Sequence, residues 1–418
     1  MFKVCCLFLL FFKFVMAHHE TVAVYAVDMK TGKVILDENS DKSMIPASCL
    51  KIVTTGAALS LLDPTSQFKT ELQYDGEIRD GILYGNLYIK GGGDPALGSE
   101  RLGSSWKNQV AIWGEAISKC GIQKIEGRVI GDDSLWEKGK PIGSWEVEDV
   151  GNYYGASASA LSFHENSYSL FFKPSSVGSP ALIVRTDPPF ARLSFLTEVL
   201  TGHEGSGDQA SIYGSEYSFV RFVQGTIPAG VSEFMIKGSV PDSARLCAEI
   251  LAESLEVKGT TFEEKERTTF HTTFSPQVKE IVFWTNQKSV NLFAEHLLKA
   301  MGGGSTKAGI EAVKTFWKSQ NIDLEGFNMV DGSGLSRQNF MTARQLVGVL
   351  LKMKDSKPFF DSLPLLNEKA RAKSGSMSNI KCCVGYEDNV AFAILVNHHT
   401  DRQKATQIVN DYLSKLTY

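Results

Sequence analysis

The chain has 418 residues, a length typical of two or three domains, and its 43% hydrophobic and 22% charged residues are usual for a globular protein. This composition excludes a largely disordered chain and a bundle of membrane helices. The formal net charge of -4 provides no basic excess to neutralise phosphates, which argues against nucleic acid as a partner.

The first 17 residues, MFKVCCLFLLFFKFVMA, have an early lysine, an apolar block and small residues at the end. This is the pattern of a secretory signal peptide, so we expect residues 1–17 to direct export and the mature protein to be periplasmic. Lys13 interrupts the apolar block, which is shorter than the roughly 20 residues that span a bilayer. The alternative is an uncleaved segment that keeps the protein membrane-associated.

Five cysteines follow the predicted signal peptide, so at least one thiol is unpaired. A disulfide between Cys120 and Cys247 is possible only if the fold brings them together, and the sequence leaves this pairing open. No cysteine or histidine spacing resembles a zinc site. We therefore expect no metal and no other cofactor.

In chain order, residues 22–36 predict two strands joined by a turn, and the apolar spacing from Ser48 to Leu62 predicts a helix. Strand-like runs separated by Gly, Pro, Asp and Asn then continue from about residue 66 to 283. Helical periodicity returns at 289–301 and 342–353. The sequence ends with a strand at 390–396 and an amphipathic helix.

Ser48 and Lys51 lie three residues apart at the start of the first predicted helix, so their side chains share one face. A serine hydroxyl needs a nearby base, and a lysine can serve where its surroundings favour the neutral amine. The helix N-terminus helps to lower the pKa of the amine and to stabilise an oxyanion. The spacing alone is weak support, because Ser104 and Lys107 repeat it.

Two later motifs follow in order: SVN at residues 289–291 and KSGS at residues 373–376. Ser-x-x-Lys, Ser-x-Asn and Lys-Ser/Thr-Gly in this order are the signature of serine β-lactamases and penicillin-binding proteins. The surrounding sequence resembles one family, the D-alanyl-D-alanine carboxypeptidase/endopeptidases, which are class C low-molecular-mass penicillin-binding proteins. The resemblance lies in IPASCLK, GNLYIKGGGDPAL, GRVIGDD, SVNLFAEHLLKAMG, DGSGLSR, AKSGSM and AFAILVN.

This resemblance implies an α+β fold with a split transpeptidase/β-lactamase-like domain, an antiparallel sheet flanked by helices, made of residues 18–64 and 285–418. Residues 65–284 would form a large β-rich insert of one or two smaller domains. Class A β-lactamases have a much shorter interval between the first two motifs, and their deacylating Glu motif is not recognisable here. The long interval therefore fits the carboxypeptidase/endopeptidase family.

The implied function is that of a serine D,D-carboxypeptidase, with D,D-endopeptidase activity as a further expectation. It would cleave D-Ala-D-Ala or cross-linked stem peptides of peptidoglycan, and β-lactam antibiotics would inhibit it covalently. The alternatives are a serine β-lactamase, which would deacylate fast, and a non-catalytic peptidoglycan-binding scaffold.

The resemblance also implies roles for single residues. Ser48 would attack the carbonyl of the penultimate D-alanine, and Lys51 would take its proton. Ser289 would relay a proton to the leaving amine, while Asn291 would orient Lys51 or the substrate amide. Lys373 would supply positive charge.

Further residues are implied to contact the substrate near its carboxylate end. Ser374 and Ser376 would offer hydroxyls to the terminal carboxylate, with Gly375 between them. The backbone N–H groups of Ser48 and Ser376 would form the oxyanion hole. Two positions depart from the usual family pattern: Val290 stands where Asp is usual, and Ser374 where Thr is commoner.

Three more candidates lie outside the motifs. Arg337 is predicted to contact the acidic end of the peptide, although a solvated loop arginine is nearly as good an interpretation. Asp149 and Tyr154 match the place where the family has a pocket for the free amine of a diaminopimelate side chain. An acid beside an aromatic wall suits an ammonium group, but Glu146 and Glu148 are neighbouring alternatives to Asp149.

Overall fold

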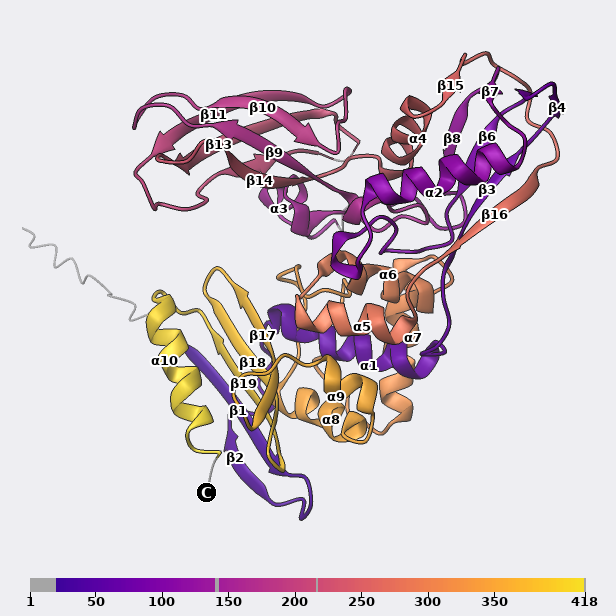
Figure 1. The fold of residues 1–418 in the computed structure, drawn as a ribbon. Helices are drawn as coiled ribbons and strands as arrows, with labels where there is room; N and C mark the ends of the chain where they lie inside the picture. Colours follow the sequence, from indigo (N-terminus) through magenta and orange to yellow (C-terminus); the bar gives the residue numbers. More distant parts are fainter. Residues whose placement is uncertain (1–19, 140–142, 216, 417–418) are drawn as a thin grey trace, which may run out of the picture.

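The computed structural model describes residues 20–139, 143–215 and 217–416. The predicted signal peptide at residues 1–17 lies outside the described residues. Every helix within the described ranges is too short or too polar to cross a bilayer. Figure 1 shows a sheet-and-helix body made from both ends of the chain, with the middle of the chain arranged as two further modules against its helices.

A five-stranded sheet joins the two ends of the chain in the order β17-β18-β19-β1-β2. All of its neighbouring strands pair antiparallel, and β1 pairs with β19 from Thr21↔Asn397 to Asp28↔Val390. The predicted antiparallel sheet is therefore confirmed. The strands are β1 (Thr21–Asp28), β2 (Val34–Glu38), β17 (Ala370–Met377), β18 (Ile380–Glu387) and β19 (Val390–Asn397).

Helices cover both faces of this sheet, as predicted (Figure 1). Because side chains alternate along a strand, Ile394 of β19 packs with Val409 of the C-terminal helix, whereas Ala393 and Leu395 face the other helices. The helix on the first face is α10 (Arg402–Leu413). Those on the second are α1 (Lys51–Leu61), α5 (Val278–Gln287), α6 (Asn291–Met301), α7 (Thr306–Ser319), α8 (Ala343–Met353) and α9 (Lys357–Ser362).

Helix α1 lies at the centre of the helical layer and is buried from Lys51 to Leu59. A short 3₁₀ helix, Ala47–Leu50, leads into it from the sheet. Trp317 crosses α1 closely: its indole N–H donates to the Val53 carbonyl at 3.1 Å. This packing fixes the N-terminal end of α1, where Ser48 and Lys51 lie.

The first module of the insert contains two four-stranded sheets, β15-β7-β5-β4 and β16-β3-β6-β8, together with two helices. The sequence predicted strands here but not these helices, which are α2 (Trp106–Lys119) and α4 (Ser243–Glu253). The strands are β3 (Lys69–Tyr74), β4 (Glu77–Arg79), β5 (Ile82–Tyr84), β6 (Leu87–Lys90), β7 (Lys124–Ile125), β8 (Val129–Asp132), β15 (Glu256–Val257) and β16 (Thr268–Phe274).

The second module contains two three-stranded sheets, β10-β9-β14 and β11-β13-β12. Its strands are β9 (Ser167–Lys173), β10 (Leu182–Asp187), β11 (Ser194–Gly202), β12 (Ser211–Tyr213), β13 (Val220–Pro228) and β14 (Phe234–Ser239). The short helix α3 (Val147–Val150) lies beside β12. The domain limits given from the sequence stay a prediction.

The two insert modules share one apolar core cluster. Cys247 is buried in this cluster and Cys120 packs against it, yet both thiols are free. Among the described residues, the disulfide that the sequence left open is therefore not formed.

Candidate active site

The side chains of Ser48 and Lys51 meet where the 3₁₀ helix runs into α1. Lys51 Nζ lies 3.2 Å from Ser48 Oγ, and it also donates to Asn291 Oδ1 at 2.6 Å and to the Ser333 carbonyl at 2.7 Å. A neutral amine has two N–H groups and one lone pair. With both N–H groups directed at the amide and carbonyl oxygens, the lone pair faces the Ser48 hydroxyl, as a general base requires.

The surroundings of Lys51 favour this neutral amine. Lys51 is fully buried, and burial together with the positive charge of Lys373 lowers its pKa to about 7. Asp331 and Glu295 act in the opposite direction, because their carboxylates favour the ammonium form. The balance leaves a large fraction of neutral amine close to neutral pH.

The helix that carries the SVN motif begins later than predicted. The sequence predicted that it starts at Ser289. Helix α6 begins at Asn291, and Ser289 precedes it in a left-handed conformation with φ 56°. Ser289 lines the same cavity as Ser48, and Val290 is buried in the main apolar core. Asn291 connects three parts of the molecule, because its amide oxygen accepts from Lys51 and its amide N–H donates to the Tyr154 carbonyl at 2.8 Å.

Strand β17 carries the KSGS motif and runs directly past the 3₁₀ helix. A Cβ atom on Gly375 would lie 2.8 Å from the Pro46 carbonyl oxygen and 3.1 Å from the backbone nitrogen of Ser48. Only glycine allows the strand to approach the Ser48 amide this closely. Lys373 is buried on the same side of the strand, where its Nζ donates to the Ser374 carbonyl at 2.6 Å and burial lowers its pKa.

Cys49, which follows the candidate nucleophile, faces away from the cavity. Its thiol is fully buried and donates to the Lys373 carbonyl at 3.2 Å. Burial raises the pKa of Cys49 to about 12, so the thiolate is not populated near neutral pH.

The insert forms one wall of the cavity through α3 and the residues around it. Arg337 donates from Nε to Glu146 at 2.9 Å and from Nη1 to the Ser378 carbonyl at 3.2 Å, so it joins the insert to the β17–β18 turn. Asp149 is half-buried, and burial raises its pKa, as do the charges of Glu146 and Glu148.

Tyr154 belongs to the same wall of the cavity. Its hydroxyl is hydrogen-bonded to Asp149, and this bond opposes the upward shift in the pKa of the Asp149 carboxyl. Burial and the charge of Asp149 raise the pKa of Tyr154, which stays a neutral phenol.

A cavity of about 510 Å³ collects most of the predicted site residues. Its lining includes Ser48, Asp149, Tyr154, Ser289, Asn291, Arg337 and Ser376. Lys51, Lys373, Ser374 and Gly375 are not among its lining residues: Lys51 and Lys373 are buried, whereas Ser374 is exposed on the same face of β17 as Ser376, two residues earlier. Seven of the eleven predicted residues therefore line the cavity, and the other four lie outside its lining.

The sequence interpretation did not single out two buried carboxylates next to Lys51. Glu295 of α6 and Asp331 both accept hydrogen bonds from the loop at residues 331–336. Asp331 also accepts from the indole N–H of Trp145 in the insert at 2.9 Å. One signal was available: Glu295 follows Asn291 by four residues and therefore lies on the same face of α6.

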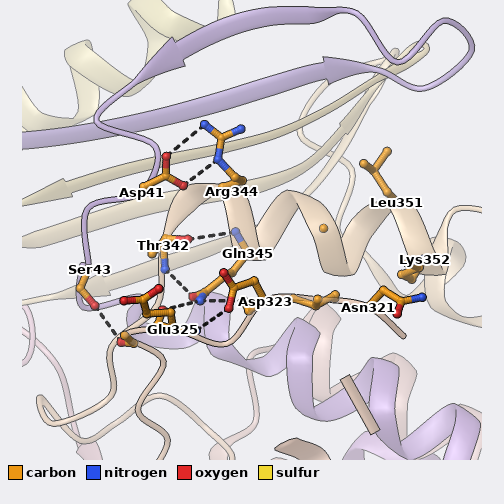
Figure 2. A pocket seen from close by; sticks show the side chains of 13 residues that line it. Asp41, Ser43, Asn321, Asp323, Glu325, Thr342, Arg344, Gln345, Leu351 and Lys352 are labelled. Carbon is orange, nitrogen blue, oxygen red and sulfur yellow. Dashed lines mark hydrogen bonds and ion pairs between the residues drawn. The ribbon is translucent and has the colours of Figure 1, made fainter. Parts of the chain in front are cut away.

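A second and larger cavity, of about 920 Å³, lies between α8 and the segment that follows α7 (Figure 2). Its polar groups pair with one another: Arg344 with Asp41, and the Gln345 amide with the Asp323 carbonyl. Ser43 is the serine in its lining and donates to the Gly326 carbonyl at 2.9 Å. Because this lining contains no hydroxyl activated by a base, the smaller cavity is the candidate active site.

Several known proteins are similar to this chain in sequence. A sequence model of the D-Ala-D-Ala carboxypeptidase 3 (S13) family matches residues 16–366. The D-alanyl-D-alanine carboxypeptidase of Actinomadura sp. (strain R39) is 27% identical, over 90% of this chain and 78% of its own length. The D-alanyl-D-alanine carboxypeptidase DacB of Haemophilus influenzae is 23% identical, over 91% of this chain and 86% of its own length.

Solved structures show the same fold. Penicillin-binding protein 4 (dacB) from Haemophilus influenzae superposes with a TM-score of 0.77 at 21% identity, covering 91% of both chains. The same protein in complex with a novel β-lactam superposes with a TM-score of 0.73, covering 95% of this chain and 96% of that one.

Proposed function

We propose, from the premise that the chain belongs to the D-Ala-D-Ala carboxypeptidase 3 (S13) family of serine hydrolases, that Ser48 is its nucleophile and Lys51 the base that activates it. The observation that carries this assignment is the 3.2 Å separation of Lys51 Nζ from Ser48 Oγ, with both N–H groups of the neutral amine already engaged.

The proposed reaction has two steps. Ser48 Oγ attacks the carbonyl carbon of the penultimate D-alanine while its proton passes to Lys51. The C–N bond then breaks, the leaving amine of the terminal D-alanine takes up a proton relayed by Ser289, and an acyl-enzyme ester remains. Water hydrolyses this ester and restores the Ser48 hydroxyl. A cross-linked peptide reacts in the same way when its leaving amine belongs to a side chain, which is the endopeptidase reaction.

The substrate's carboxylate end is assigned to β17. Lys373 supplies positive charge there, and the Ser374 and Ser376 hydroxyls donate to the terminal carboxylate. The backbone N–H groups of Ser48 and Ser376 are proposed as the oxyanion hole, which the close passage of Gly375 over the Ser48 amide supports. Arg337 is proposed to use its remaining N–H groups for the acidic end of the peptide.

The experiment that tests this function uses a labelled penicillin and the intact protein. We expect one stable covalent adduct in the mass spectrum, located by proteolysis on the peptide that contains Ser48, and release of D-alanine from a D-Ala-D-Ala peptide. Rapid turnover of the drug without a lasting adduct supports the alternative of a β-lactamase. The absence of both an adduct and D-alanine release supports a non-catalytic scaffold.

The rate of this acylation is expected to depend on pH through Lys51. Its pKa of about 7 means that the amine is mainly protonated below that pH and mainly neutral above it. The acylation rate should therefore rise through pH 7 to a plateau, and fall about tenfold for each unit further below it. Stopped-flow measurement of the labelled penicillin over a pH series gives the midpoint. A rate independent of pH across this range contradicts the role of Lys51.

Asp149 is proposed to bind the free ammonium group of a diaminopimelate side chain, with Tyr154 as the neighbouring aromatic wall. Replacing Asp149 with Asn should lower kcat/KM for such a peptide roughly tenfold, because a charge-assisted hydrogen bond is lost. The same peptide with an acetylated amine should be cleaved equally by both proteins. Glu148→Gln is the matched control; a larger loss in that variant than in Asp149→Asn assigns the ammonium to Glu148 instead.

Export is part of the proposed function, because peptidoglycan lies outside the inner membrane. Residues 1–17 are proposed as a cleaved signal that delivers the enzyme to the periplasm, and N-terminal sequencing of the mature protein tests this. Residues 18–64 and 285–418 are proposed as the catalytic domain and residues 65–284 as its insert.

A further inference from the structure

The loop at residues 331–336, with the sequence DGSGLS, holds α1 at the level of the active site. Two of its consecutive carbonyl groups accept from α1: the Gly332 carbonyl from Thr54 Oγ1 and the Ser333 carbonyl from Lys51 Nζ, both at 2.7 Å. The position of the Ser333 carbonyl therefore decides where one N–H of the Lys51 amine points.

Glu295 fixes this part of the loop from the opposite side. Its Oε1 accepts from the backbone N–H groups of Gly332 and Ser333 at 3.0 and 2.8 Å, and its Oε2 accepts from Gly332 at 3.0 Å. The carboxylate thus binds the N–H groups of the same two residues whose carbonyls bind α1. The contact is tight, because a Cβ atom on Gly332 would lie 2.7 Å from the Ala294 carbonyl oxygen.

One helix supplies both constraints on the amine. Asn291 and Glu295 are one turn apart on α6: the first binds Lys51 Nζ directly, and the second binds the loop that presents the Ser333 carbonyl. If α6 and the loop moved apart, the amine would lose the two acceptors that leave its lone pair on Ser48.

A buried carboxylate at this position lowers the stability of the fold, because the charge loses its hydration. This cost argues that Glu295 has a role beyond packing. Glu295 is 4% exposed, and burial together with the charge of Asp331 raises the pKa of its carboxyl, whereas the hydrogen bonds from Gly332 and Ser333 and the charge of Lys51 favour the carboxylate. Asp331 is fully buried and occupied by backbone N–H groups and by Trp145. Two neighbouring buried acids destabilise a fold unless each binds a specific set of donors.

We propose that Glu295 is a positioning residue for acylation. Its carboxylate binds the backbone N–H groups of Gly332 and Ser333 and so fixes the direction of the Ser333 carbonyl. That carbonyl in turn keeps the Lys51 amine oriented with its lone pair toward Ser48. This proposal rests on the proposed function, since it concerns the same nucleophile and base.

The charge of Glu295 also has a consequence for pH dependence. The charged groups that face Lys51 are Glu295 from α6, Asp331 from the loop and Lys373 from β17, together with the neutral thiol of Cys49. Glu295 itself also faces Lys299, one turn further along α6. Removing the Glu295 charge takes away one group that favours the ammonium form, so the pKa of Lys51 should fall and the acylation midpoint should move to lower pH.

Two variants separate the geometric effect from the charge effect. Glu295→Gln removes the charge and one of the two acceptor oxygens, whereas Glu295→Asp keeps the charge but is too short to reach both N–H groups. We expect both to lower the plateau rate of penicillin acylation roughly tenfold to a hundredfold, because a small displacement of a reacting group is costly. Only Glu295→Gln should also shift the midpoint to lower pH.

A matched control is Val313→Ala in α7, which should open a cavity in the same core and lower the melting temperature, while Val313 has no polar side-chain atom that could hydrogen-bond to the loop. The proposal is overturned if Glu295→Gln and Glu295→Asp keep the wild-type plateau, or if their loss is no greater than that of Val313→Ala. If Glu295→Gln does not fold, the plateau of Glu295→Asp decides alone. A wild-type protein that is not acylated refutes the proposed function instead, so the two failures are distinguishable.

Discussion

Replacing Lys51 with Gln is expected to slow penicillin acylation of Ser48 by roughly 10³- to 10⁴-fold, the range lost when a positioned general base is removed. Glutamine keeps an N–H donor of the kind that Asn291 and the Ser333 carbonyl accept from, on a side chain one atom shorter than that of lysine. It has no basic lone pair for the Ser48 proton, so the hydroxyl stays a weak nucleophile. The second-order rate constant for adduct formation, measured on the plateau above neutral pH, gives the size of the loss.

Two controls make this result specific. Ser48→Ala gives the background signal of the assay, because no adduct can form on this residue without the hydroxyl. Lys107→Gln makes the same chemical change in the Ser-x-x-Lys pair formed by Ser104 and Lys107, where the lysine lies over the Trp106 ring. Its acylation rate should equal that of the wild type. Acylation of Lys51→Gln at a rate close to the wild type would falsify the assignment of the base.

Gly334→Ala is expected to destabilise the protein and to slow acylation together. Gly334 has φ 80°, a conformation that costs other residues roughly 1 kcal/mol or more, and a Cβ atom there would lie 1.9 Å from the Ala47 carbonyl oxygen. That contact forces the loop or the 3₁₀ helix to move, which adds a further cost of about 1–3 kcal/mol. Because Ala47 precedes Ser48, the displacement reaches the nucleophile.

Thermal unfolding and the acylation rate measure the two effects of Gly334→Ala. Gly178→Ala is the matched control, since Gly178 has φ 84° and no atom within 4 Å of the added Cβ. Gly178→Ala should lower the free energy of unfolding by the cost of the left-handed conformation alone, because the added Cβ meets no other atom. Its acylation rate should equal that of the wild type. Equal losses of stability in the two variants, with acylation intact in both, argue against close packing of the loop on the 3₁₀ helix.

The sequence predicted which site residues lie close together when they are also close in the chain, but it did not predict their conformations as well. Ser48 and Lys51 are three positions apart in the sequence, and one helical turn brings such a pair together in almost any fold. Ser289 shows the limit of this reasoning, because the apolar repeat that follows it predicted a helix start two residues too early. Its left-handed conformation depends on how the chain enters α6, which the repeat does not record.

Two helices of the insert were missed for a related reason. In α2 the buried side chains Trp113 and Ile117 are one turn apart, but the exposed Ile112 next to Trp113 and the glycine Gly114 inside the helix obscure the apolar repeat. Flanked by clear strand patterns, such a segment does not stand out. Its helix is stabilised by packing on the insert's core, and this contribution is tertiary.

The sequence by itself determined the order of the three motifs, the pairing of Ser48 with Lys51 and the α+β fold, since each follows from local spacing or from the resemblance to a known family. Only the tertiary structure decided what surrounds the base. The Ser333 carbonyl lies 282 residues from Lys51, and the Gly332 and Ser333 amides lie 37 and 38 residues from Glu295. Contacts over such separations depend on how helices, loop and insert pack together, and packing is set by the whole chain rather than by any one segment of it.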